Sequence, residues 1–74
     1  PLLEALLNGL RLVEGVPITM LSQRTGLEAE AINAALASSR AQGLLVADEQ
    51  RAACTDLGFR HLNTVLERLA TQVG

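Results

Sequence analysis

The hydrophobic pattern changes character at LLVADEQRAACT, residues 44–55. Two short apolar runs in this segment flank the polar residues Asp48, Glu49 and Gln50, a pattern typical of a β-hairpin with a polar turn. The strands are expected to be weak, because the alanines at positions 47, 52 and 53 are poor strand formers. A short hairpin of this kind, placed among helices, is the first indication of the architecture.

Three helical segments precede the hairpin, at residues 1–13, 18–24 and 28–42. Gly15 and Pro17 mark the end of the first segment and the start of the second, because glycine favours the position after a helix and proline its first turn. Thr25-Gly26 and Gly43 end the other two. The second and third helices, joined at residues 24–27, resemble a helix-turn-helix.

A last helix is predicted from Asp56 to about Gln72, with Thr55 as its N-cap. Its apolar residues repeat at helical spacing on one face: Leu62, Val65, Leu66, Leu69 and Val73. The order helix, helix, helix, hairpin, helix predicts a mainly α fold with a small β-hairpin. The sequence therefore predicts a single winged-helix-like domain over residues 1–74.

Composition narrows the function classes. The net charge is −2, there is no lysine, and the six basic residues are scattered arginines. Nucleic-acid binders usually carry a basic patch, so no nucleic-acid partner is expected. No apolar run has the roughly 18 residues of a membrane span, and no secretory signal is visible. With one cysteine, which fits a reducing compartment, the chain is predicted to be cytoplasmic and to have no membrane partner.

The first helix is unusually apolar. At about 100° per residue, its apolar side chains cover roughly 200° of the helix, about twice the stripe of an ordinary surface helix. Gly9 lies inside this arc, although glycine is unfavourable in a helix. We expect the helix to contact its own domain and a second body. Since the chain starts within the helical pattern at Pro1, a piece excised from the C-terminus of a larger protein is expected; enclosure by the domain itself is the alternative.

Two blocks of residues carry a family resemblance. The first is E-x-x-x-x-G-L-R-L-x-x-G, from Glu4 to Gly15, and the second is T-x-x-G-x-x-x-x-N-x-V, from Thr55 to Val65. With the less specific RTGL and GLL, the chain resembles, over nearly its whole length, the C-terminal domain of the radical-SAM coproporphyrinogen III oxidase family. That family includes the oxygen-independent oxidase and the related haem chaperones, and the second block is closer to the chaperones.

The resemblance implies a role beside a catalytic barrel that carries a [4Fe-4S] cluster and S-adenosylmethionine. The parent would be an oxidase of haem biosynthesis or a haem-delivery protein, and this domain would pack on the barrel and help to cover the tetrapyrrole. One cysteine cannot hold a cluster that needs several thiolates. The chain by itself is therefore expected to hold no cofactor or metal and to have no catalytic residue.

Four polar residues are candidates for contacts with the barrel or the substrate: Glu4, Asn8, Arg11 and Asn63. Glu4, Asn8 and Arg11 follow each other at i, i+4 and i+7, on one narrow strip of the first helix. Arg11 could bind a carboxylate with its planar guanidinium, or bond within its own domain. Asn63 lies in a helix, where asparagine is mildly unfavourable, so it is expected to bond a loop or the barrel.

The remaining reactive side chains have simpler interpretations. His61 and Cys54 supply at most two ligands, fewer than a metal site needs, and Cys54 is expected to be a small buried apolar residue. The alternative function is a winged-helix DNA-binding regulator that dimerises through its first helix. Glu28 and Glu30 at the start of the third helix argue against base reading. Self-association of the isolated chain stays open.

Overall fold

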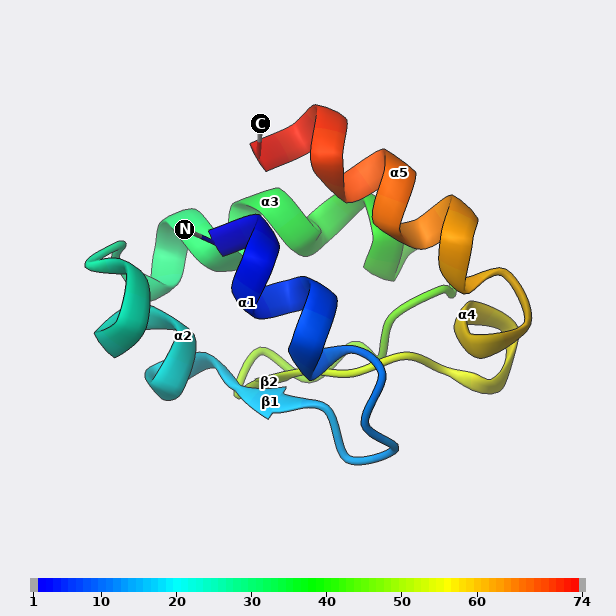
Figure 1. The fold of residues 1–74 in the computed structure, drawn as a ribbon, viewed down its shortest axis with the longest axis horizontal. Coiled ribbons are helices and arrows are strands. Elements are labelled where there is room, and N and C mark those ends of the chain that lie inside the picture. Colours follow the sequence, from blue (N-terminus) through cyan, green and yellow to red (C-terminus); the bar gives the residue numbers. More distant parts are fainter. Residues whose placement is uncertain (1, 74) are drawn as a thin grey trace.

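Within residues 2–73, five short helices lie above and beside a very small antiparallel sheet (Figure 1). The computed structural model describes the backbone of residues 2–73 and the side chains of residues 2–71. Its elements are α1 (Leu2–Gly9), β1 (Val16–Pro17), α2 (Ile18–Thr25), α3 (Ala29–Ala41), β2 (Arg51–Ala52), α4 (Asp56–Arg60) and α5 (Leu62–Val73). The predicted class, mainly α with a small β-hairpin, is confirmed.

The predicted hairpin is present, and its second arm pairs on both sides. On one side, Leu45 and Cys54 form a β-bridge, and Val46 N–H donates to the Ala53 carbonyl at 2.9 Å. On the other side, β2 pairs antiparallel with β1. The interpretation of residues 14–17 as a mere break was therefore incomplete, because Val16 pairs with Ala52. α2 begins at Ile18, as predicted, and Pro17 is its extended N-cap residue and not its first helical residue.

The first helix is shorter than predicted. α1 ends at Gly9 and not at Val13, and Pro1 lies outside the described residues. A side chain at Gly9 is excluded, since a Cβ there would lie 2.6 Å from Cγ1 of Val16. Because Gly9 has no side chain, β1 can pack closely against the end of α1. After Gly9 the chain turns away through residues 10–15. Gly9 has an explanation inside the domain and does not require a second body.

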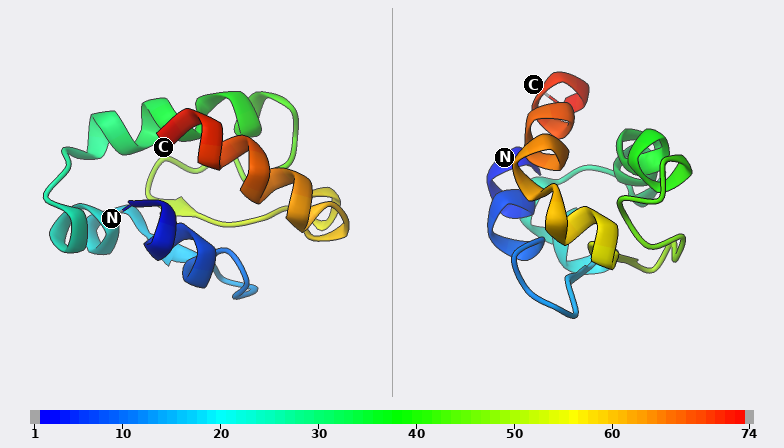
Figure 2. Two further views of the ribbon diagram at one scale, coloured as in Figure 1. Left: turned by 45° about the horizontal axis from the view of Figure 1, so that its top comes forward. Right: turned by 90° about the vertical axis from the view of Figure 1, so that its right-hand side faces the viewer.

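The hydrophobic core lies among α1, α2, α3 and α5 and continues onto the sheet. Figure 2 shows the arrangement of these helices from two further directions. Its fully buried members are Leu6, Leu10, Leu21, Ile32, Leu36, Leu45, Val65 and Leu69. Val65 and Leu69 confirm the predicted inner face of the last helix; the side chain of Val73 lies outside the described residues. The inner leucines of α1 are covered by the domain, as the enclosure alternative requires.

The predicted last helix is divided into two. The backbone leaves the helical region at His61, with φ −122° and ψ 38°, so α4 and α5 are separate. α4 is fixed to the base of the hairpin: Thr55 Oγ1 donates to the Gly43 carbonyl at 2.5 Å and accepts from Gly58 N–H at 3.1 Å. α5 lies instead along α3 and α1. One straight helix cannot follow both directions.

Arg40 fastens the hairpin to the end of α3. Its guanidinium donates to the side-chain oxygen of Asn33 at 2.7 Å and to the carbonyls of Val46, Asp48 and Arg51 at 3.0–3.2 Å. Asn33 in turn donates to the Glu49 carbonyl at 3.3 Å. A weakly hydrogen-bonded hairpin is thereby held in one position against α3.

Within residues 2–73, no helix has the length and apolar character needed to cross a membrane.

Candidate functional site: the groove between α1 and α2

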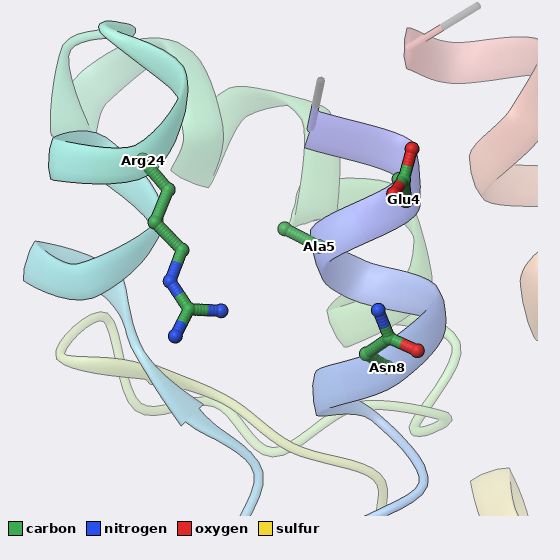
Figure 3. Close-up of a pocket in the computed structure, with 4 residues that line it drawn as sticks. All are labelled: Glu4, Ala5, Asn8 and Arg24. Atoms are coloured by element: carbon green, nitrogen blue, oxygen red, sulfur yellow. The ribbon is translucent and has the colours of Figure 1, made fainter.

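A polar hollow of about 180 Å³ lies between α1 and α2. Its lining residues are Glu4, Ala5 and Asn8 from α1 and Arg24 from the last turn of α2 (Figure 3). Arg24 extends across the space toward α1, and Ala5 points into it from the opposite side. The small side chain of Ala5 leaves room for a group from outside the domain.

Arg24 carries a charge that no ion pair balances within the described part of the chain. Among residues 2–71, the one ion pair joins Arg51 and Asp48, with 3.6 Å between Nε and Oδ2. Glu4 lines the same hollow, but its carboxylate points away from Arg24 (Figure 3). Arg24 is exposed, and its fork of N–H donors matches the geometry of a carboxylate. The hollow therefore presents an unpaired donor group from α2 and the amide of Asn8 from α1.

A second hollow of about 210 Å³ continues the groove and is more apolar. It shares Ala5, Asn8 and Arg24 with the first hollow and adds these residues: Gly9, Leu12, Gly15, Val16, Pro17 and Met20. The side chains of Leu12 and Met20 are 59% and 38% exposed, and neighbouring Val13 is 82% exposed. The first helix was expected to leave apolar surface uncovered. In the structure, exposed apolar side chains lie instead in the turn after α1 and on α2.

The turn at residues 10–15 is held in place by the sheet. Gly15 has φ +72°, and a Cβ there would lie 2.0 Å from the carbonyl oxygen of Ala52, so only glycine fits. Arg51 donates from Nη1 to the Glu14 carbonyl at 3.0 Å. The exposed side chains of Leu12 and Val13 are consequently presented by a turn with a fixed base.

The structure brings two of the four predicted contact residues together and separates the other two. Glu4 and Asn8 share the polar hollow, but Arg11 does not line either hollow and donates from Nε to the Leu7 carbonyl at 3.1 Å. The predicted strip of three residues fails because α1 ends before Arg11. Asn63 is exposed on α5, away from the groove.

Arg24 was not among the predicted residues. It occupies the turn of the predicted helix-turn-helix, where the sequence gives no reason to place it near Glu4. The only available signal was its basic side chain in the last turn of a short helix, where arginine commonly interacts with the helix dipole. Its role in the groove depends on how α1 and α2 pack.

The face that would read DNA in a winged helix is poorly suited to phosphate. Glu28 and Glu30 are exposed at the start of α3. Arg40, the basic residue at the other end of that helix, directs its donors to the hairpin. Neither end of α3 offers a free cation to a nucleic-acid backbone.

The described residues do not fit an iron–sulfur cluster or another metal site. Among residues 2–73, no three His, Cys, Asp or Glu side chains lie close enough together to hold a metal ion. Cys54 is buried in the core, and this burial raises the pKa of its thiol above the ordinary value of 9.0. A thiol with a raised pKa is a poor nucleophile and a poor ligand at neutral pH.

Comparison with known proteins gives one family. The model of the HemN C-terminal domain family matches residues 1–61, which extend from the start of the chain through α4. Searches of curated proteins and of solved structures found no match. The matched region contains every residue that lines the groove. The chain belongs to the HemN C-terminal domain family.

Proposed function

We propose that this chain is the C-terminal accessory domain of a radical-SAM protein of the coproporphyrinogen III oxidase and haem-chaperone family, and that it packs on the catalytic barrel through the α1–α2 groove. The parent would act in haem biosynthesis or haem delivery. Family membership supports the general role. The observation that carries the docking surface is the coincidence of an unpaired Arg24 with exposed Leu12 and Met20 along one groove.

The composition of this surface is that of a protein interface. Interface centres are enriched in methionine, arginine and aromatic residues and depleted in other charged groups, and the groove offers the first two of these. Leu12, Val13 and Met20 come from two adjacent elements and face solvent in the isolated domain. Contiguous apolar surface beside a polar rim is typical of a binding site on a soluble protein. Covering the groove would remove the exposed side chains of Leu12 and Met20 from water.

The domain would cover the barrel and position the tetrapyrrole, and it would not itself make or break bonds. The cluster and S-adenosylmethionine would be held by the barrel and would supply the radical chemistry of the oxidase when bound. Residues of this chain would exclude water from the barrel's open side and help to orient a bound tetrapyrrole. Glu4 and Asn8 are the predicted contact residues that lie on the docking surface, whereas Arg11 and Asn63 lie away from it.

A DNA-binding function has less support. It needs free basic side chains on α3 and the hairpin, because neutralising phosphates supplies most of the affinity for DNA. Arg40 is engaged by the hairpin, and Arg51 bonds the Glu14 carbonyl and pairs with Asp48. The acidic start of α3 would add repulsion. We therefore propose that the partner is protein and not nucleic acid.

Small-angle scattering of the full-length polypeptide tests the docking surface. We expect the double variant Leu12→Ser/Met20→Ser to release the domain and increase the maximum dimension of the particle. The matched control is Leu27→Ser/Leu57→Ser, which removes two leucines of similar exposure, 40% and 44%, that do not line the groove. Identical scattering from the groove variant and the unchanged protein would refute docking through this surface.

A further inference from the structure

The groove has features that specify what occupies it. We propose that the α1–α2 groove binds one short segment of the parent polypeptide in which an acidic side chain and an aliphatic side chain occupy neighbouring positions. The carboxylate would bind Arg24 and Asn8, and the aliphatic side chain would lie between Leu12 and Met20. This inference rests on the proposed docking function and identifies the chemistry of its partner.

Charge identifies the polar half of the segment. Arg24 lies at the centre of the groove because it lines both hollows, and the described residues offer it no ion pair. Burying an unpaired guanidinium against a partner would be costly, so a partner that covers this surface must supply an acceptor, and a carboxylate is the best match. The amide of Asn8 can donate to the same carboxylate. Glu4 disfavours a second acid and can accept a backbone N–H of the segment.

Size identifies the class of occupant. The two hollows measure about 180 and 210 Å³, whereas pockets that enclose a drug-sized ligand or cofactor measure about 300–1,000 Å³. Each hollow by itself is too small to enclose a macrocycle and has room for about one side chain. Because the hollows share Ala5, Asn8 and Arg24, both side chains would come from neighbouring positions of one segment.

The apolar half of the groove is ready to receive its side chain. Gly15 packs against the Ala52 carbonyl, and Arg51 holds the Glu14 carbonyl, so the turn that carries Leu12 has a fixed base. Met20, on the opposite wall, has a flexible thioether side chain that adapts to different aliphatic shapes. A fixed wall facing an adaptable one suits a leucine, isoleucine or valine.

Photocrosslinking in the purified full-length polypeptide tests the inference. With p-benzoylphenylalanine in place of Met20, we expect an adduct with one segment of the same polypeptide that contains Asp or Glu beside an aliphatic residue. Arg24→Glu should reduce the yield at least fivefold. Arg60→Glu is the control, since Arg60 is exposed on α4 and does not line the groove. Arg24→Glu should keep the unfolding midpoint of the unchanged protein.

Each outcome separates this inference from the proposed function. An adduct with the same polypeptide that is insensitive to Arg24→Glu, or lies in a segment without an acid, overturns the inference and leaves docking intact. Adducts only between two copies, or no adduct at all, overturn both. Adducts only with a bound tetrapyrrole overturn this inference and docking through the groove, but keep the proposed role of the domain at the tetrapyrrole. The decisive support is rescue: replacing the crosslinked acid by arginine in the Arg24→Glu protein should restore the adduct.

Discussion

Gly9 of α1 and Val16 of β1 are so close that a Cβ on the glycine would lie 2.6 Å from Cγ1 of the valine. This contact fixes the distance between the first helix and the sheet. It also explains why a glycine interrupts an otherwise strongly helical apolar run, and it directs the chain into the turn that presents Leu12 and Val13.

The Gly9–Val16 contact predicts a destabilising glycine-to-alanine change. Alanine is favoured over glycine in a helix by about 1 kcal/mol, yet overpacking typically costs about 1–3 kcal/mol. We expect Gly9→Ala to lower the free energy of unfolding in urea. In the Gly9→Ala/Val16→Ala double variant the two costs should be less than additive, because the clash is gone. A more stable Gly9→Ala protein would contradict the contact.

Arg40 is expected to be the most important charged residue for stability. Arg40→Met keeps the aliphatic stem but removes hydrogen bonds to Asn33 and to three hairpin carbonyls. We expect a loss of about 2–4 kcal/mol in urea unfolding, with faster amide exchange at Val46 and Arg51. The control Arg60→Met, on an exposed arginine, should stay within about 0.5 kcal/mol. Equal effects of the two changes would argue against the Arg40 interactions.

The buried thiol of Cys54 is expected to make the free energy of unfolding fall at alkaline pH. Burial raises the pKa of its thiol above 9.0 in the folded state, so folding disfavours the thiolate. The resulting stability is fully present below the unfolded pKa and is lost as pH rises through the folded pKa. The chain has no Lys and no Tyr, so Cys54 is the side chain expected to titrate at alkaline pH below the range of arginine. Urea midpoints should fall as pH rises above the ordinary pKa of a thiol, and Cys54→Ala should flatten the profile; an unchanged slope in that variant would contradict this.

Nucleic-acid binding is expected to be absent. A 30-base-pair duplex titrated with the chain at 0.15 M salt should show no saturable anisotropy change up to about 100 µM, which is the weak end of non-specific DNA affinity. The same titration at 0.05 M salt tests for an electrostatic contribution. Saturable binding that weakens steeply between these two salt concentrations would favour the regulator alternative.

Apolar spacing and turn residues predicted much of this fold. The inner face of α5, the hairpin and the Thr55 cap depend on residues close in sequence, and each was placed correctly. The end of α1 was wrong because Leu10, Leu12 and Val13 continue the apolar pattern, whereas the helix stops at a contact with β1. The division at His61 was missed for the same reason: α4 is fixed by the hairpin, and α5 packs on other helices.

The candidate site was only half visible in the sequence. Glu4 and Asn8 share one face of a helix, and spacing along a single element is enough to pair them. Arg24 joins them only through the packing of α2 against α1, which no local pattern reveals. Arg11 was grouped with them by assuming a longer helix. Contacts between elements, rather than patterns within them, determined each of these errors.

The central claim is that the domain docks through the α1–α2 groove. Amide hydrogen exchange tests this claim most directly. Exchange would be compared between this 74-residue chain alone and the same residues in the full-length polypeptide. Docking predicts at least tenfold slower exchange over residues 5–24 in the full-length protein, with residues 29–53 of α3 and the hairpin unchanged. Equal rates in both proteins, or protection centred on α3 and the hairpin, would contradict the claim.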